Sequence, residues 1–236
     1  MNFSDRQLFH PFSLVLLSGG VGKRVGSSLP KQYLPLNKQP VICHSLKVFL
    51  AMEELEEVVV VCQEQYHDLI SQELNKREIH FATPGMRRQD SLYAGLKALQ
   101  DRPKQLICVH DAARPLIDAT LVRRVVKEAS QYGAAVAAVP VKATVKVADA
   151  QGCIQQTLNR EQLWEIQTPQ VIRKQLLMQG FAHAFSQHLT VTDDSSLVEK
   201  IGGVVKIVEG SYHNIKLTTK EDLAFLQYFI EKNDLL

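Results

Sequence analysis

The sequence has no long hydrophobic runs. In its 236 residues the longest apolar runs are Val58–Cys62 and Ala134–Val139. A membrane-spanning helix needs about 20 apolar residues, so no span is expected. The N-terminal sequence MNFSDRQLFHPF has no apolar core followed by a cleavage site, which argues against a secretory signal. We therefore expect a cytoplasmic protein that does not associate with membranes.

Cysteine is scarce and scattered. The four cysteines form no Cys-x-x-Cys pair, which excludes zinc-ribbon and redox motifs of that kind. We interpret them as reduced thiols, and Cys62 and Cys108 lie in apolar, strand-like runs that predict a place in the core. Internal repeats, low-complexity tracts and linkers rich in Pro, Gly or Ser are also lacking. Residues 1–236 are therefore interpreted as a single domain, with residues 1–12 as an N-terminal extension.

Acidic residues are missing from one stretch. The chain has a formal net charge of +2, yet the segment from Arg6 to Met52 contains no Asp or Glu. This basic segment surrounds a Gly-rich turn, a combination that indicates a bound anion. A chance distribution or a basic surface facing RNA are the alternatives, and a small polyanion is favoured because the glycines accompany the cations. Basic residues do not interleave with aromatic ones as they do in RNA-binding platforms, so no nucleic-acid partner is expected.

The chain alternates strand and helix signals. Hydrophobic residues make up 45% of the chain and charged residues 22%, as in soluble globular proteins. Short apolar runs predict strands at 14–17, 57–62, 78–82, 105–109 and 134–141. Helical spacing predicts helices at 42–50, 64–74, 88–99, 119–130 and 223–230. Repeated βα units are typical of an α/β fold with a mainly parallel, doubly wound sheet, in which ligands bind at the carboxyl ends of the strands.

One segment departs from this alternation. Residues 144–149 alternate in polarity, residues 150–152 form a turn signal, and residues 153–158 alternate weakly. This pattern predicts an inserted β-hairpin, an arm that spans residues 142–160. A hairpin of this size is marginal alone, so it must pack on something. A second subunit and the arm's own domain are equally compatible with these residues.

The Gly-rich turn Ser18–Gly26 (SGGVGKRVG) directly follows a predicted strand. It is not a P-loop, because Gly22-Lys23 is followed by Arg24 where that motif needs Ser or Thr. It is not the dinucleotide fingerprint either, because the third glycine comes one residue late. A glycine loop with Arg24, followed by Pro30-Lys31, is the pattern of nucleotidyltransferases. The alternative is an ordinary strand-to-helix turn.

Beyond this loop the sequence resembles the family of 2-C-methyl-D-erythritol 4-phosphate cytidylyltransferases. The resemblance covers about residues 13–230 and depends on eight signatures that occur in the family's order. These are Gly19–Gly26, Pro30–Tyr33, Gly85 with Arg88–Ser91, His110–Pro115, Pro140–Thr144, Asn159-Arg160 with Leu163-Trp164 and Gln167–Gln170, Thr192–Ser195, and Asn214–Lys216.

The resemblance implies a Rossmann-like nucleotidyltransferase domain with an inserted β-hairpin arm, and a homodimer formed by arm exchange. It implies transfer of CMP from CTP to 2-C-methyl-D-erythritol 4-phosphate in non-mevalonate isoprenoid biosynthesis. The products would be pyrophosphate and 4-diphosphocytidyl-2-C-methyl-D-erythritol, and the cofactor Mg²⁺, carried mainly by the CTP phosphates. Ser18 departs from the alanine or glycine usual in the family, near the expected nucleobase site.

Two alternatives keep the same fold. The related ribitol-phosphate cytidylyltransferases share most of the signatures, so ribitol 5-phosphate or glycerol phosphate is an alternative substrate. The pair Ala112-Ala113 favours the methylerythritol branch. A catalytically inactive nucleotide-binding regulator is the other alternative, and the retained cations argue against it.

The chemistry accounts for the residue types. The nucleophile is a phosphate oxygen that is already anionic, so no general base is needed and catalysis reduces to positioning and cationic stabilisation. The resemblance assigns catalytic roles to Arg24, Lys31, Lys216 and Arg160. It assigns nucleotide contacts to Gly19, Gly20, Gly22, Gly85, Ser91 and Asp111, and polyol-phosphate contacts to Thr144, Arg160, Lys216, Asp111 and Arg114. No protein residue is assigned to a metal.

Several neighbouring residues are given structural roles. Arg88 is expected to pair with Asp90 or to order its loop, and His110 is expected to be structural. The pair Asp193-Asp194 precedes a helix and is expected to cap it rather than to bind a metal. Ser91 could also be a plain cap, and Arg114 could fix its loop by an ion pair. Trp164 and the run 167–170 are expected to frame the site.

Overall fold

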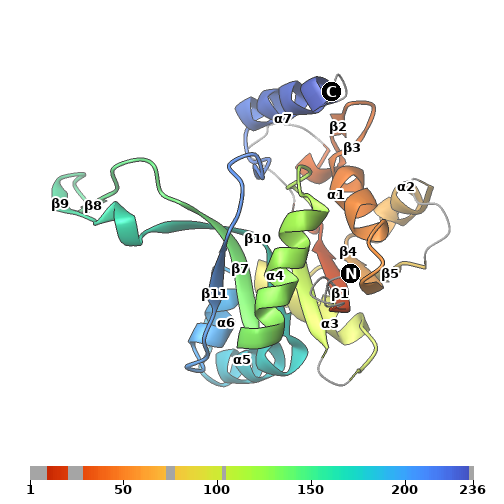
Figure 1. Ribbon diagram of the computed structural model, residues 1–236, viewed down its shortest axis with the longest axis horizontal. Helices are drawn as coiled ribbons and strands as arrows, with labels where there is room; N and C mark the ends of the chain where they lie inside the picture. Colours follow the sequence, from red (N-terminus) through yellow and green to blue (C-terminus); the bar gives the residue numbers. More distant parts are fainter. Residues whose placement is uncertain (1–9, 21–28, 73–77, 103–104, 234–236) are drawn as a thin grey trace, which may run out of the picture.

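A seven-stranded β-sheet forms the centre of the molecule (Figure 1). The structure, a computed structural model, describes residues 10–20, 29–72, 78–102 and 105–233. The strand order is β11-β7-β10-β6-β1-β4-β5. These strands are β1 (Phe12–Leu17), β4 (Leu55–Val61), β5 (His80–Ala82), β6 (Leu106–Asp111), β7 (Ala134–Pro140), β10 (Trp164–Arg173) and β11 (Lys206–Glu209).

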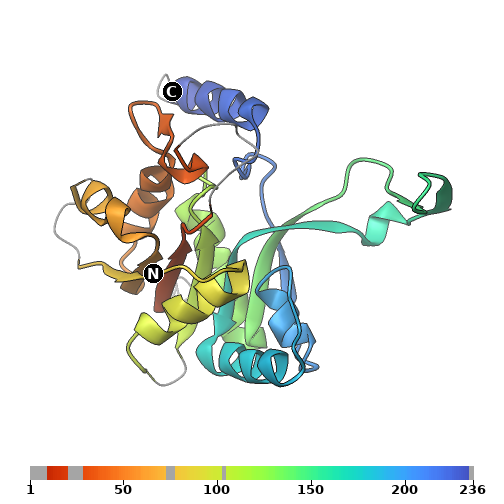
Figure 2. The same cartoon turned by 180° about the vertical axis from the view of Figure 1, so that it is seen from behind.

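Helices cover both faces of this sheet (Figures 1 and 2). One face is covered by α1 (Val41–Leu50), α2 (His67–Gln72) and α4 (Ala119–Tyr132). The other is covered by α3 (Arg88–Ala98), α5 (Lys174–Ser186) and α6 (Ser195–Glu199). The predicted α/β fold with a mainly parallel sheet is confirmed. No helix among the described residues is long and apolar enough to span a bilayer.

The apolar runs explain why the strands are buried on both sides. Along β1, Leu14 and Leu16 pack into the core on the α1 and α4 face, whereas Val15 packs into the core on the α3 face. Successive side chains of a strand point to opposite faces, so a continuous apolar run supplies both cores at once. The predicted core residues Cys62 and Cys108 are buried in the first of these cores.

A third, smaller core joins the C-terminal helix to the sheet. Helix α7 (Lys220–Asn233) places Leu226 and Ile230 against Leu36 and Ala113. Leu36 belongs to a short hairpin of β2 (Pro35–Leu36) and β3 (Gln39–Pro40). This core ties the chain that precedes α7 to the turn that follows β6.

Strand β10 is the central strand that the sequence did not reveal, and the edge strand β11 and helix α5 were not predicted either. The segment with Trp164 and the run 167–170 was expected only to frame a site. It is a central strand that pairs antiparallel with both β6 and β7. The reason is the inserted arm. The chain leaves the sheet after β7, forms the arm, and returns beside β7 in the opposite direction.

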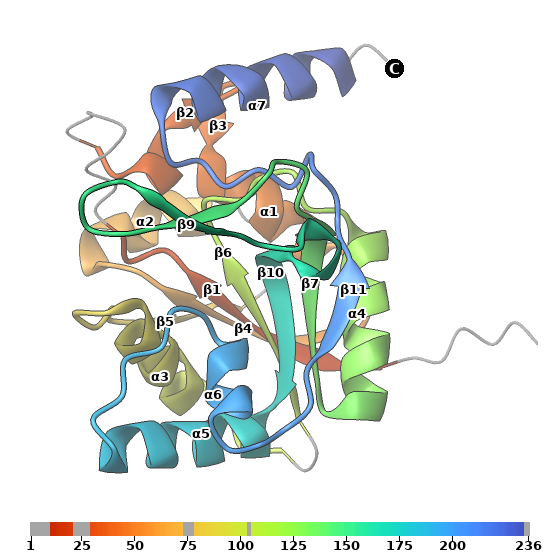
Figure 3. The same cartoon turned by 90° about the vertical axis from the view of Figure 1, so that its left-hand side faces the viewer.

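The arm is a β-hairpin, as its alternating pattern predicted. It consists of β8 (Lys146–Ala148) and β9 (Ile154–Thr157), followed by a short 3₁₀ helix, η4 (Arg160–Gln162). Figures 1 and 2 show that it projects away from the sheet, and Figure 3 views it from its far end. Val147 is 42% exposed and Ile154 is 66% exposed, so both present apolar surface at the far end of the arm.

Close packing of α3 on the sheet requires a glycine. A Cβ atom at Gly95 would lie 2.6 Å from Cγ1 of Val15 and 2.9 Å from Cγ2 of Val61. We expect Gly95→Val to lower the free energy of unfolding by about 1–3 kcal/mol, because overpacking forces the helix off the sheet. Ala98→Val adds the same side chain at an exposed position of α3 and serves as the control in denaturant unfolding. Equal losses in the two variants would contradict this role of Gly95.

Candidate active site

A cavity lies at the carboxyl ends of the central strands. Strand pairing places Leu17, the last residue of β1, opposite both Val61 and Asp111, so three parallel strands end together. The cavity has a volume of about 260 Å³. Its lining consists of Leu17, Ser18, Gly19, Gly20, Lys31, Gln32, Gly85, Met86, Arg87, Arg88, Ser91, Asp111, Ala113 and Lys216. The described lining thus carries four cationic side chains and one carboxylate, which suits a polyanion.

The structure brings together seven of the residues predicted for the site. Gly19, Gly20, Lys31, Gly85, Ser91, Asp111 and Lys216 all line the cavity. Gly22 and Arg24 lie outside the described residues. Thr144 and Arg160 are exposed on the arm and do not line the cavity of their own chain. Arg114 lies three residues beyond Asp111 and is not part of the lining either.

Gln32 holds the start of the glycine loop. Its amide Nε2 donates to the carbonyl oxygens of Ser18 and Gly20, at 2.7 and 2.8 Å. Gln32 is only 3% exposed and follows Lys31 in a short 3₁₀ helix, η2 (Lys31–Tyr33). The same amide therefore fixes the loop relative to Lys31. The sequence contained this residue in a signature, but nothing in its type indicated the role.

The hydroxyl of Ser18 also forms a hydrogen bond within the protein. Its Oγ donates to the Tyr33 hydroxyl at 2.8 Å, and the Tyr33 ring stacks on Tyr66 with 3.7 Å between ring centroids. Burial raises the pKa of Tyr33 above its usual value, although the bond from Ser18 opposes this, so the phenol stays protonated. Ser18 therefore ties the start of the glycine loop to Tyr33.

The loop before α3 forms a second wall of the cavity. The backbone N–H of Gly85 donates to Oγ of Ser91 at 3.1 Å. The predicted pairing of Arg88 with Asp90 is wrong, because Arg87 forms that ion pair at 2.8 Å. Asp90 also accepts from the backbone N–H of Arg87, which closes the first turn of α3. Arg88 instead points to the ends of the strands.

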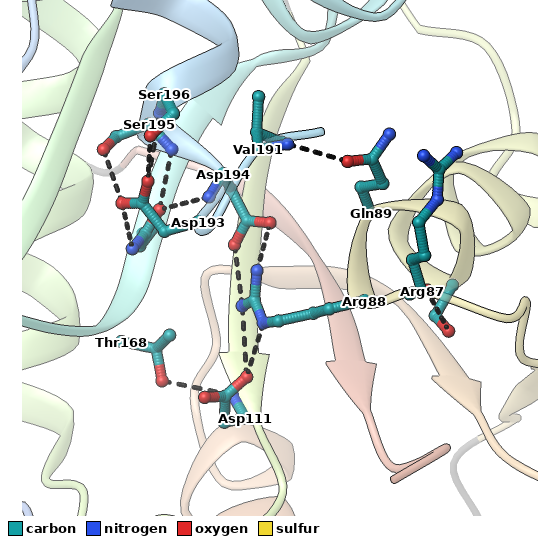
Figure 4. A network of polar contacts seen from close by, with 12 residues as sticks. Arg87, Arg88, Gln89, Asp111, Thr168, Val191, Asp193, Asp194, Ser195 and Ser196 are labelled. Carbon is teal, nitrogen blue, oxygen red and sulfur yellow. Dashed lines mark hydrogen bonds and ion pairs between the residues drawn. The ribbon is translucent and has the colours of Figure 1, made fainter. Parts of the chain in front are cut away.

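Arg88 joins two buried carboxylates (Figure 4). Its Nε and Nη2 atoms donate to Oδ1 of Asp111 at 3.2 and 3.1 Å. Its Nη1 and Nη2 atoms donate to Oδ1 and Oδ2 of Asp194 at 2.5 and 2.9 Å. On the cavity side, Oδ2 of Asp111 accepts from Nζ of Lys216 at 2.6 Å. Burial alone would raise the pKa of Asp111, but Arg88 and Lys216 hold it well below its usual value, so the group is a carboxylate.

The position of Lys216 is set by the chain on both sides of it. The N–H of Leu217 donates to the carbonyl of Ala113 at 2.8 Å. Nη1 of Arg114 donates to the carbonyl of Asn214 at 2.7 Å, and the buried Asn214 amide donates to the carbonyl of Thr168 at 2.8 Å. Arg114 was considered for substrate binding or for fixing its loop by an ion pair. The structure shows that it fixes the loop, but through a hydrogen bond to the carbonyl of Asn214 and not through an ion pair.

His110 precedes Asp111 in β6 and is fully buried. Its Nε2 atom lies 3.1 Å from the carbonyl of Arg114, which can only accept, so Nε2 carries the proton. Nδ1 is then free to accept from the Thr168 hydroxyl at 3.1 Å, and Thr168 Oγ1 accepts from the N–H of Asp111 at 3.1 Å. Burial lowers the pKa of His110 to about 4, so the ring is neutral at physiological pH. These contacts favour the structural role.

The neutral His110 ring predicts a pH-dependent stability. The unfolded chain binds a proton near pH 6.5 but the folded chain only near pH 4, so stability is fully present above pH 6.5 and falls as the pH drops towards 4. Between pH 7 and pH 5 we expect His110 to contribute a loss of about 2 kcal/mol. Denaturant unfolding at both pH values tests this, with His110→Gln as the reference. The same pH dependence in both proteins would contradict the assignment.

The two aspartates before α6 have different roles. Asp193 caps the helix, because its Oδ1 accepts from the N–H of Ser196 at 3.3 Å and its Oδ2 from the Ser195 hydroxyl at 2.7 Å. Asp194 makes no such cap, and only 2% of its surface is exposed, since its carboxylate is bound to Arg88. The expectation that the pair caps the helix is therefore correct for Asp193 and wrong for the side chain of Asp194.

Metal ligation by protein side chains has little basis in the described part of the chain. No group of three or more His, Cys, Asp or Glu side chains there is arranged to hold a metal ion. The one carboxylate in the cavity lining, Asp111, is bound by two cations.

Comparison with known proteins decides the family. Residues 12–232 match the family model of 2-C-methyl-D-erythritol 4-phosphate cytidylyltransferase. The chain belongs to this family.

Individual relatives agree with this membership. The chain is 51% identical over 217 residues to the chloroplastic 2-C-methyl-D-erythritol 4-phosphate cytidylyltransferase of rice, covering 91% of this chain and 73% of the rice protein. It is 40% identical over 223 residues to the protein of that name from Syntrophotalea carbinolica, covering 92% and 95% of the two chains. A crystal structure of 4-diphosphocytidyl-2C-methyl-D-erythritol synthase from Anaerococcus prevotii superimposes with a TM-score of 0.82 and 28% identity, covering 94% of this chain and 99% of that one. The cavity described above is thus the candidate active site of a cytidylyltransferase, a nucleotidyltransferase enzyme.

Proposed function

We propose that the protein uses this cavity to transfer CMP from CTP to 2-C-methyl-D-erythritol 4-phosphate in isoprenoid biosynthesis. Family membership over residues 12–232 supports this assignment most strongly. A phosphate oxygen of the polyol phosphate forms a bond to the α-phosphorus of CTP, and the bond from that phosphorus to the β-phosphate oxygen breaks. Pyrophosphate leaves with the bonding electrons, and 4-diphosphocytidyl-2-C-methyl-D-erythritol is formed. No proton needs to be removed from the nucleophile.

The walls of the cavity divide the two substrates. We assign the CTP phosphates to the side of the glycine loop and Lys31, because a Cβ at Gly20 would meet no atom of the described residues within 4 Å, and a backbone without side chains lets phosphate oxygens approach its N–H groups. Gly85 and Ser91, on the wall formed by the loop before α3 and the start of that helix, are assigned to the cytosine and ribose. Lys216 and Asp111, on the floor, are assigned to the polyol phosphate. Arg24, which lies outside the described residues, is assigned to the triphosphate.

Charge is the main catalytic means in this proposal. The transition state carries negative charge on the phosphate oxygens as two anionic groups approach each other. Cationic groups already fixed at those positions stabilise it without reorganisation. Lys31 and Arg24 would act on the CTP phosphates, and Lys216 and Arg160 on the incoming phosphate.

A second subunit completes the site in this proposal. Thr144 and Arg160 lie on the arm, which extends away from the sheet (Figure 1), and neither residue lines the cavity of its own chain. The exposed apolar residues Val147 and Ile154 give the arm a surface to bury against a partner. We infer that arms are exchanged in a homodimer, so that each cavity receives Thr144 and Arg160 from the partner.

Magnesium is proposed to enter with the nucleotide. The phosphates of CTP supply the hard oxygen ligands that Mg²⁺ prefers. Asp111 lies at the cavity floor, but its carboxylate already serves Arg88 and Lys216. The substrate is therefore written as the magnesium complex of CTP. A cytoplasmic location remains a prediction from the sequence.

The substrate assignment is tested by pyrophosphate release. With CTP and Mg²⁺, we expect turnover with 2-C-methyl-D-erythritol 4-phosphate and little with D-ribitol 5-phosphate. Turnover with ribitol phosphate alone would keep the cationic chemistry but overturn the substrate. Release with neither substrate would favour an inactive nucleotide-binding protein.

Gln32 provides a separate test of the nucleotide side. In Gln32→Glu, a carboxylate oxygen replaces the amide donor and faces the carbonyls of Ser18 and Gly20. We expect KM for CTP to rise about tenfold or more, because buried acceptors lose their donor and meet a like charge. Gln72→Glu, at an exposed position of α2, is the matched control in steady-state kinetics. A change below twofold in Gln32→Glu would contradict the role of this clamp.

A further inference from the structure

The carboxylate that binds Lys216 is itself held by residues behind the cavity. Arg88 occupies Oδ1 of Asp111 with two N–H groups and leaves Oδ2 for Lys216. Asp194 binds the other side of the same guanidinium with both of its oxygens. Asp194 does not line the cavity and is 2% exposed, so it has no access to a substrate. Any influence it has on the reaction must pass through Arg88.

Asp194 is fixed in turn by the strand that the arm introduces. Its backbone N–H donates to Oε1 of Gln170 at 3.1 Å, and the N–H of Ser195 donates to the same oxygen at 2.9 Å. Gln170 belongs to β10, beside β6, which ends at Asp111. Gln170 therefore ties the start of α6 to β10, and Arg88 connects it to the end of β6 (Figure 4).

We propose that Asp194 is a positioning residue for catalysis, which acts through Arg88 and Asp111 to place the ammonium group of Lys216 at the polyol phosphate. This inference rests on the proposed function, in which Lys216 binds that phosphate. Asp194 gives the partly buried guanidinium of Arg88 a second carboxylate partner and fixes its plane. The plane of the guanidinium then decides which oxygen of Asp111 faces the cavity.

The geometry gives a reason for the effect of losing Asp194. When the Asp194 carboxylate is removed, Asp111 is the remaining anionic partner of Arg88 among the described contacts. The preferred arrangement of a guanidinium and a carboxylate is bidentate, with two parallel hydrogen bonds. Arg88 would then draw on both oxygens of Asp111, and Lys216 would lose its anchor. A misplaced cation in a preorganised site costs rate because charge stabilisation depends on position.

Steady-state kinetics test this in Asp194→Asn. We expect kcat/KM for 2-C-methyl-D-erythritol 4-phosphate to fall at least about tenfold, and KM for CTP to change less than about twofold. Asp193→Asn is the matched control, because it weakens the start of the same helix without touching Arg88, and we expect a loss below about threefold. Arg88→Lys, which keeps the charge but loses the fork, provides the same test if Asp194→Asn fails to fold.

A double-mutant cycle separates positioning from general damage to the fold. In a Lys216→Ala background nothing remains to be placed, so adding Asp194→Asn is expected to cost less than about twofold. A loss that persists undiminished in that background would overturn the proposal. A loss in Asp194→Asn no larger than in Asp193→Asn would overturn it as well.

A measurement without turnover keeps this inference apart from the proposed function. Trace acetylation followed by mass spectrometry reports the reactivity of Lys216 in the substrate-free protein. We expect Lys216 to react at least about threefold faster in Asp194→Asn than in the wild type, and at the wild-type rate in Asp193→Asn. Unchanged reactivity in Asp194→Asn would overturn the coupling even in an active enzyme. Faster labelling in a protein that does not use the methylerythritol substrate would support the coupling and place the failure on the proposed function.

Discussion

Replacing Lys31 with alanine is expected to lower kcat/KM at least about 10²-fold, a loss of about 2.7 kcal/mol in transition-state stabilisation. Lys31 lines the cavity at the start of η2 and directly precedes the residue that clamps the glycine loop. Its ammonium group is therefore carried by a backbone that is fixed relative to that loop. In the proposed mechanism, a cation held in this way stabilises the negative charge that develops on the CTP phosphates.

Lys47→Ala is the matched control for this variant. Lys47 belongs to the same segment without acidic residues but lies on the exposed side of α1. Its removal changes the local charge equally without touching the cavity, so kcat/KM is expected to stay within about twofold. A loss below about fivefold in Lys31→Ala, or similar losses in both variants, would contradict the catalytic role of Lys31.

Arg160→Ala is expected to act on the other substrate. We expect KM for the polyol phosphate to rise at least about tenfold, kcat/KM for that substrate to fall by about 10²-fold, and KM for CTP to change less than about twofold. The guanidinium binds phosphate through two parallel N–H groups, which a single alanine removes together. Within its own chain Arg160 is exposed and its Nη1 donates to the carbonyl of Lys142 at 3.0 Å. The large effect is therefore expected only if the arm reaches another cavity.

Lys146→Ala provides the comparison on the same arm. Lys146 is an exposed cation of β8 that contacts Thr157 across the hairpin. We expect its loss to leave KM for the polyol phosphate within about twofold. Equal behaviour of the two arm variants in kinetics would argue against a specific phosphate contact of Arg160.

The sheet was predictable from the sequence because burial on both faces leaves continuous apolar runs. Val58–Cys62 and Ala134–Val139 are such runs. The first forms the second half of β4 and the residue after it, and the second forms most of β7. The hairpin was predictable from its alternation. Strand β10 was not, because its start carries Trp164, Glu165 and Gln167, polar or bulky residues that lie where the arm returns to the sheet. The combination of an inserted hairpin and the apolar pair Val171-Ile172 was the one available signal.

The residues of the candidate site were predictable where a short sequence pattern or the end of a strand places them. The glycine loop, Lys31 and Asp111 follow strands or lie beside them, and their place at one edge follows from parallel pairing. The partner of Arg88 was not predictable, because nearness in sequence favoured Asp90, whereas the actual partners are 23 and 106 residues away. The same holds for the ion pair of Lys216 with Asp111, which joins residues 105 positions apart. Contacts of this kind depend on how strands and loops meet.

The central claim is that one cavity combines the cations of one chain with the arm of another. It is tested most directly by mixing two inactive proteins, Lys31→Ala and Arg160→Ala, and measuring pyrophosphate release in isolated heterodimers. Exchanged arms predict that one of the two cavities in each heterodimer has both Lys31 and Arg160, so about half of the wild-type activity should return. Verified heterodimers that stay as inactive as their parents would contradict a site shared between subunits.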